Sequence, residues 1–230
     1  MAKDPRKRQK KLERRKAKAK AKKKAIVRQA SRGMAVRFQE AAEAPILHCS
    51  TTRTLWDEGM SPLLISRKLP SGQVAYAIFL LDVYCLGVKD VILGVVPRSR
   101  YDWQVYGKLR EDHRLVKLKP EAARKLVEGA VGYARGFGLQ PHSDYRKARP
   151  IFGDVDADCC TEEFVYGKDG KPYFVAGPYD SPWRCKQIIR ALTDHCGPDG
   201  FYYTVPLAPS GAVLTDGDEF LIEDDGEWEE

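Results

Sequence analysis

The sequence lacks an apolar run long enough to cross a membrane, and its first residues lack the apolar stretch of a secretory signal. A membrane-spanning helix needs roughly 18–20 apolar residues, whereas the longest run here, Val74 to Leu81, is only as long as a strand. The N-terminus is charged, with no hydrophobic region behind it, unlike a signal peptide. We therefore expect a soluble, cytoplasmic protein with no membrane partner.

Motifs for common enzyme chemistries are also missing. The sequence has no P-loop, no Gly-x-Gly-x-x-Gly and no Gly-x-Ser-x-Gly, so nothing supports a nucleotide-dependent enzyme or a serine hydrolase. Its 6 cysteines include no Cys-x-x-Cys pair and are too sparse for a disulfide scaffold. Hydrophobic residues nevertheless make up 43% of the chain, which predicts a folded core.

Basic and acidic residues are separated along the chain. Residues 1–33 contain 16 Lys or Arg and two acids, which gives a charge of +14. Residues 215–230 contain nine acids and no base, a charge of −9, and residues 34–214 are left with +2. This asymmetry predicts a basic arm (1–33) that is disordered or helical on binding, one α+β domain (34–214) and a disordered acidic tail (215–230). The tail could also shield the arm in cis.

The arm has the composition of a polyanion-binding segment. Lysine and arginine neutralise phosphates without reading sequence, and the arm contains no aromatic residue on which single-stranded bases could stack. In composition it resembles the basic tails of ribosomal and ribosome-associated proteins. We therefore expect a non-catalytic RNA-binding protein, with solubility, targeting or membrane-surface attraction as alternatives. The phosphate-contacting residues are expected to be Arg6, Lys7, Arg8, Lys10, Lys11, Arg14, Arg15, Lys16, Lys18, Lys20, Lys22, Lys23 and Lys24.

The middle region predicts an α+β fold in which a mostly antiparallel sheet, built from two hairpins, is covered by helices on one face. The first hairpin pairs 63–69 with 73–83 and is followed by a strand at 89–96. The second pairs 163–166 with 172–176 around the Asp169-Gly170 turn. A last strand is expected at 201–205. Helices are expected at 34–44, from a Ser99 cap to 111, from Pro120 to 136–138, near Tyr145 and from Ser181 to 195.

Residues 80–90, Leu-Leu-Asp-Val-Tyr-Cys-Leu-Gly-Val-Lys-Asp, resemble a segment of a family of uncharacterised bacterial proteins. The likeness spans about 45–205 and includes Pro-His-x-Asp-Tyr at 141–145 and Ile-Phe-Gly-Asp-Val-Asp at 151–156. The segments 167–172 and 177–180 complete the pattern. No known activity is attached to this family, so the resemblance implies a shared fold and no chemistry.

Two acidic clusters are candidates for a catalytic or metal site. Asp82 follows an apolar strand, where a carboxylate is costly unless it is paired or used, and Asp90 lies nearby in sequence. Asp154, Asp156 and Asp158 begin like an EF-hand loop, but Cys159 and Val165 occupy the positions of the required Gly and Glu. The alternative function is therefore a metal-dependent phosphodiesterase or nuclease, in which Asp82, Asp90, Asp154 and Asp156 hold Mg²⁺.

Ordinary structural roles could also explain these acidic residues. Asp82 could instead pair with Lys89 or cap a turn near Gly87, and the 154–158 carboxylates could form a solvated loop. Zinc would suit the pairs His48-Cys49 and His195-Cys196, but their separation in sequence leaves open whether they meet.

Overall fold

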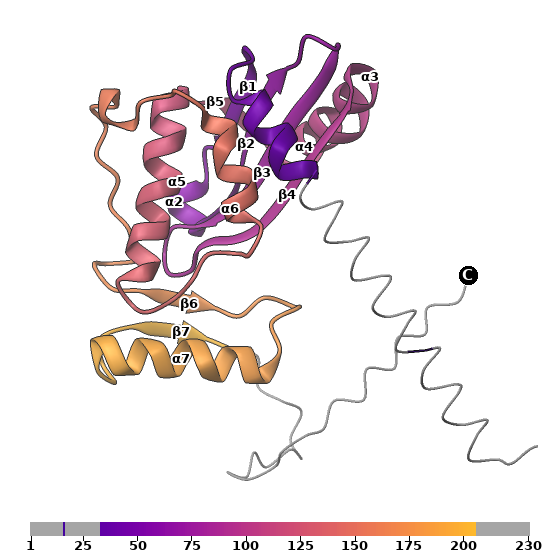
Figure 1. Ribbon diagram of the computed structural model, residues 1–230. Helices are drawn as coiled ribbons and strands as arrows, with labels where there is room; N and C mark the ends of the chain where they lie inside the picture. The colour runs from indigo at the N-terminus through magenta and orange to yellow at the C-terminus, as the bar shows by residue number, and fades with distance from the viewer. Residues whose placement is uncertain (1–15, 17–32, 206–230) are drawn as a thin grey trace, which may run out of the picture.

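The computed structural model describes residue 16 and residues 33–205, so nearly all of the basic arm and the whole acidic tail lie outside the described residues. The described chain is an α+β fold (Figure 1). Five strands form one sheet in the order β4-β3-β2-β1-β5, and all its neighbouring pairs are antiparallel. No helix within the described residues is both long and apolar enough to span a bilayer.

The sheet is built from β1 (Ile46–Thr52), β2 (Met60–Lys68), β3 (Gln73–Asp82), β4 (Gly87–Pro97) and β5 (Leu115–Lys117). The predicted first hairpin is confirmed: β2 and β3 pair from Met60↔Asp82 to Lys68↔Val74. The expected third strand is β4, which continues the sheet beside β3 with a register shift at Leu80/Leu81. The three-residue β5, which pairs with β1, was not expected from the sequence.

The main core lies between one face of this sheet and the helix α5 (Pro120–Arg135). Alternate strand residues such as Leu63, Ile65 and Phe79 point to this face and are fully buried. The apolar stripe of α5 packs on them, and its buried members are Ala122, Ala123, Leu126, Val127, Ala130, Val131 and Ala134. A helix over 33–41, α6 (Tyr145–Ala148) and the 3₁₀ turn η2 (Arg149–Phe152) close the same core.

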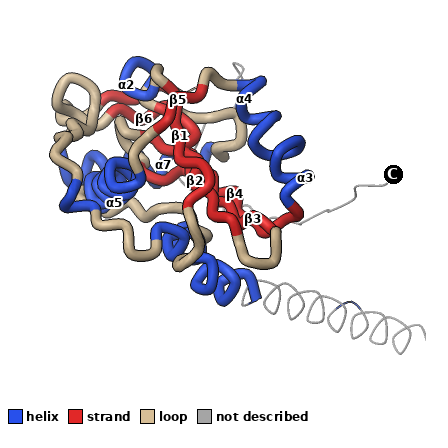
Figure 2. The backbone as a smooth tube through the Cα atoms, turned by 90° about the horizontal axis from the view of Figure 1, so that it is seen from above, coloured by secondary structure: helices blue, strands red, loops and turns tan. Residues whose placement is uncertain are grey.

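The second face of the sheet is partly covered, contrary to the expectation of helices on one face only. A helical segment consisting of α3 (Arg98–Arg100), a π-helical turn (Tyr101–Gly107) and α4 (Lys108–Asp112) lies there (Figure 2). Tyr101 is fully buried and its hydroxyl hydrogen-bonds Ser66 at 2.8 Å. Ser66 points away from Ile65 and therefore to the opposite face. Ser99 does not cap this helix, which begins at Arg98.

The second predicted hairpin is wrong. The tight turn exists, with Asp169 and Gly170 at φ 52° and 77°, and Lys168 and Lys171 bridge it. Residues 163–166, however, form no strand. The strand β6 (Tyr173–Val175) pairs in parallel with β7 (Tyr202–Thr204), and the connection between them contains α7 (Pro182–Cys196).

The unit of β6, β7 and α7 lies beside the turn between β3 and β4 (Figure 1). Its small core joins Cys85 and Leu86 of that turn to Phe174, Cys185, Ile188, Leu192 and Phe201. Tyr173 donates its N–H to the carbonyl of Tyr84 at 3.0 Å, which ties β6 to the main body. Remaining short elements are α2 (Leu55–Glu58) and the 3₁₀ turn η3 (Ala157–Cys159).

Candidate functional site

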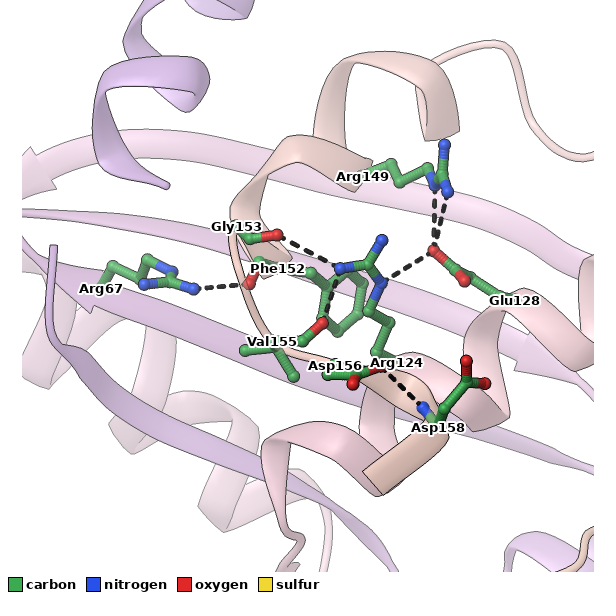
Figure 3. A network of polar contacts seen from close by, with 9 residues as sticks. All are labelled: Arg67, Arg124, Glu128, Arg149, Phe152, Gly153, Val155, Asp156 and Asp158. Carbon is green, nitrogen blue, oxygen red and sulfur yellow. Dashed lines mark hydrogen bonds and ion pairs between the residues drawn. The ribbon is translucent and has the colours of Figure 1, made fainter. Parts of the chain in front are cut away.

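Two arginines hold the 150–155 segment against the fold (Figure 3). Arg67, only 3% exposed, donates to the carbonyls of Ala44, Ile151 and Phe152 at 2.5–2.6 Å. Arg124 on α5 donates to the carbonyls of Gly153 at 3.2 Å and Val155 at 2.6 Å. The guanidinium has five donors in a fixed fork, which suits such a cluster of carbonyl acceptors. The segment after α6 is therefore fixed in position.

Glu128 connects Arg124 to a third arginine, Arg149. Its Oε1 accepts from Nε of Arg124 at 3.0 Å and from Nε of Arg149 at 3.0 Å (Figure 3). The Arg149 side chain remains about half exposed while it makes this contact. One carboxylate shared by two guanidiniums leaves a net positive charge at this point of the surface.

An open pocket lies next to Arg149, between the second half of α5, the loop 140–143 and α6. Its volume is about 440 Å³. Its charged lining consists of Arg135, Arg146, Arg149 and Glu128, and His142 lies beside them. We call Arg135, Arg146 and Arg149 the arginine pocket. The guanidiniums of Arg135 and Arg146 form no ion pair with any residue that the structure describes.

The geometry of the arginine pocket follows from local structure. Arg135 lies in the last turn of α5, where a cation is favoured by the helix dipole. Arg146 and Arg149 are three residues apart in consecutive helical turns and so project from the same side. His142 is fixed by its N–H bond to the Val88 carbonyl, and its Nε2 lies 3.7 Å from Oδ1 of Asp90.

Exposed arginines at an open pocket suit a phosphate-class anion. Their planar forks match phosphate oxygens in pairs, and such charge-assisted bonds are about twice as strong as neutral ones. The charge and openness of the site therefore suit an anion.

Asp82 is buried as predicted, at 4% exposure, and its side chain caps a turn. Its Oδ1 accepts from the N–H groups of Tyr84 at 3.0 Å and Cys85 at 2.9 Å. Burial raises the pKa of Asp82 to about 6, against the opposing effect of these hydrogen bonds. Asp82 therefore has the structural role of a turn cap, one of the two expected from the sequence. The other, an ion pair with Lys89, does not form, because Lys89 pairs with Asp180 at 2.8 Å.

The other carboxylates that the sequence predicted as metal or catalytic groups lie at the surface. Asp90 is exposed and accepts from the N–H of Val91 at 2.7 Å. Asp154, Asp156 and Asp158 are all exposed, and Asp156 accepts from the N–H of Asp158 at 3.0 Å as the cap of η3 (Figure 3). Among residue 16 and residues 33–205, no three His, Cys, Asp or Glu side chains are grouped so that they could hold a metal ion.

The histidines of the two His-Cys pairs make separate contacts. His48 stacks on Tyr106 with ring centroids 3.9 Å apart, and its Nδ1 is 2.8 Å from the Tyr101 hydroxyl. His195 is exposed at the end of α7, with Nδ1 2.8 Å from the Ala191 carbonyl. All six cysteines are free thiols.

The predicted phosphate-contacting residues of the arm lie outside the described residues, with the exception of the exposed Lys16. The arginine pocket was missed from the sequence. Arg146 and Arg149 were detectable as basic residues at helical spacing, but nothing in the sequence indicated that Arg135 would join them. No protein-family model, no curated protein and no solved structure matches this chain.

Proposed function

We propose that this protein is a non-catalytic RNA-binding protein whose basic arm and arginine pocket both contact the phosphate backbone. The observation that carries the proposal is the arginine pocket, where Arg135 and Arg146 face an open hollow with no ion-pair partner in the described part of the chain. Exposed guanidiniums of this kind favour phosphate oxygens. The +14 charge of residues 1–33 supplies sequence-independent attraction to the same polyanion.

The position of the helix over 33–41 supports joint action of the two basic regions. This helix directly follows the arm. Just after it, the carbonyl of Ala44 accepts from Arg67, which also donates to the carbonyls of Ile151 and Phe152. Arg149 immediately precedes that segment. Only one short helix therefore separates the end of the arm from the element that carries Arg146 and Arg149.

Structured RNA is the preferred target because the arm offers charge without stacking groups. Ribosomal RNA fits this description, and cosedimentation of the protein with ribosomes at low salt tests that partner.

The test is fluorescence anisotropy with an RNA hairpin between 50 and 200 mM salt. If about six phosphates are engaged, affinity falls about a thousandfold over this range. A full-length variant with Lys22, Lys23 and Lys24 changed to glutamine should bind more weakly, with a shallower dependence on salt. The double variant Arg135→Gln and Arg146→Gln should show the same kind of loss, about one unit of slope per lost contact.

The matched control is the double variant Lys186→Gln and Arg190→Gln, which removes two exposed basic residues of α7. It changes net charge by the same two units at residues that do not line the arginine pocket, so binding should remain close to that of the wild type. Failure of the full-length protein to bind the hairpin at 50 mM salt refutes the proposal. Binding that is equally lost in the control shows that only overall charge matters.

The alternative, a metal-dependent phosphodiesterase, gains no support from the geometry of its predicted residues. Electrophoresis of the hairpin after incubation with protein and Mg²⁺ tests it directly, with Asp90→Asn as the comparison. RNA shortened by the wild type and left intact by the variant would favour the enzyme.

A further inference from the structure

Two tyrosines and two lysines, each exposed or half-buried, gather at the junction of β6 and β7. Tyr173 and Tyr202 are register partners on the two strands, with ring centroids 6.3 Å apart at 83°. The ammonium of Lys168 lies over the Tyr173 ring, 5.0 Å from its centroid, and that of Lys171 lies over the Tyr202 ring, 5.4 Å from its centroid. We call these four residues the tyrosine platform.

The backbone around the tyrosine platform is well anchored. The two-residue turn between Lys168 and Lys171 closes with reciprocal hydrogen bonds of 2.8 and 3.0 Å. Gly167 donates to the Val83 carbonyl, and Tyr202 donates to the Pro172 carbonyl, at 2.9 and 2.8 Å. The hydroxyl of Tyr173 also hydrogen-bonds Oγ1 of Thr204 at 2.9 Å. The backbone that carries the rings and lysines is therefore fixed, and so is the hydroxyl of Tyr173.

A small hollow opens between the members of the platform. It is lined by Lys168, Asp169, Tyr173 and Tyr202 and has a volume of about 280 Å³. That is slightly below the range of pockets that enclose a drug-sized molecule, so it suits one planar ring. Tyr202 is 43% exposed, which leaves part of its ring free for contact.

The lysines of the platform keep their charge available. Neither Lys168 nor Lys171 forms an ion pair with a residue in the described part of the chain, and the nearest polar contact of Lys171 is the carbonyl of Asp199 at 2.8 Å. Aromatic faces next to unpaired cations are the combination that binds single-stranded nucleic acid, since a base stacks while the cation meets the adjoining phosphate.

We infer that the tyrosine platform stacks an unpaired base of the bound RNA, so that the preferred target is a helix with an adjoining single-stranded segment. This inference rests on the proposed function and extends it from the phosphate backbone to the bases. It also supplies what the arm lacks, because residues 1–33 contain no aromatic side chain.

The experiment compares three RNAs with the full-length protein by fluorescence anisotropy at one salt concentration. The first is a hairpin with blunt ends, the second is the same hairpin with a four-nucleotide overhang, and the third carries an abasic overhang of equal length. The second and third have the same number of phosphates and differ only in the bases. The base-containing overhang should bind about fivefold or more tightly than the abasic one.

Variants then assign this difference to the platform. Tyr202→Ala should remove most of the preference for bases, whereas Tyr202→Phe, which retains the ring, should keep it. The matched control is Tyr179→Ala, because Tyr179 is 98% exposed and makes no ring contact with the platform. Blunt-hairpin affinity of each variant reports whether its fold and its phosphate contacts are intact.

The outcomes separate the two proposals. If the wild type binds the hairpin with a steep salt dependence but binds both overhangs equally, the tyrosine platform is refuted while the proposed function stands. The same conclusion follows if Tyr202→Ala keeps the full preference for bases. If no RNA binds at low salt, both proposals fall. The wild-type comparison needs no variant, so it remains decisive even if Tyr202→Ala does not fold.

Discussion

Replacement of Arg67 by methionine should cost more stability than any surface substitution in this protein. The change keeps the aliphatic length of the side chain and removes its donors. Arg67 is 3% exposed and donates to three main-chain carbonyls at 2.5–2.6 Å. Each buried acceptor left without a donor costs about 1–3 kcal/mol. Because some of these carbonyls can recover a water molecule, we expect a total loss of about 3–6 kcal/mol.

Urea denaturation followed by tryptophan fluorescence measures this loss as a lower midpoint of unfolding. Since small domains are stable by about 5–15 kcal/mol, the shift should be large and some of the variant could be unfolded in buffer. Arg67→Lys should give an intermediate loss, because one ammonium cannot reach all the positions of the guanidinium fork.

The control is Arg98→Met, which breaks the exposed pair with Asp102, whose side chains are 43% and 42% exposed. That substitution should change stability by at most about 0.5 kcal/mol. A loss of less than about 1 kcal/mol for Arg67→Met would refute the reasoning. It would mean that the carbonyls do not depend on Arg67 or that water replaces it without cost.

Three further predictions concern other fixed points of the fold. Burial raises the pKa of Asp82 from 3.8 to about 6, so the folded protein binds more protons than the unfolded chain between those values. The free energy of unfolding should therefore fall as pH rises from about 4 to 6, by on the order of 3 kcal/mol at most. Denaturation of Asp82→Asn over the same pH range should lack that fall, and an equal pH dependence in wild type and variant would contradict the prediction. Gly153→Ala should lower the melting temperature, because at φ 58° its Cβ would lie 2.2 Å from a main-chain oxygen. Gly132→Ala, with no atom within 4 Å of its Cβ, should raise stability by roughly 0.5–1 kcal/mol. If both glycine variants shift the melting temperature in the same direction, the geometric argument is wrong. Lys89→Met should cost about 1–3 kcal/mol and should speed hydrogen exchange in α7, because Asp180, which is 7% exposed, loses its partner at 2.8 Å but keeps Arg184 at 3.4 Å and the N–H of Gly177. Unchanged exchange in α7 would show that the pair does not anchor it.

Local sequence patterns were sufficient to predict the first hairpin and the helices that begin at Pro120 and Pro182. In each case the information lies within a few residues: a strand-length apolar run, a turn, or a cap with proline in the first turn. Ser181 does cap α7, since its hydroxyl accepts from the N–H of Arg184 at 3.2 Å. Burial of Asp82 was also predictable, because the carboxylate directly follows an apolar run.

The second hairpin shows where local information ended. The turn at Asp169-Gly170 was correct, but the chain beyond it pairs with β7, about thirty residues away in sequence. Its choice of partner depends on α7, which packs Ile188 and Leu192 onto Phe174. A turn motif sets the direction of the backbone for a few residues and does not decide which strand arrives beside it.

The sequence by itself determined the separation of charge, because net charge in a segment depends only on the residues it contains. It also determined the α+β class, since alternating and helical apolar patterns record which faces must be buried. Only the tertiary structure brought Arg135 to Arg146 and Arg149, and Tyr173 to Tyr202. Such meetings depend on how helices and strands pack over long separations. That packing is fixed by the core as a whole, and no local motif records it.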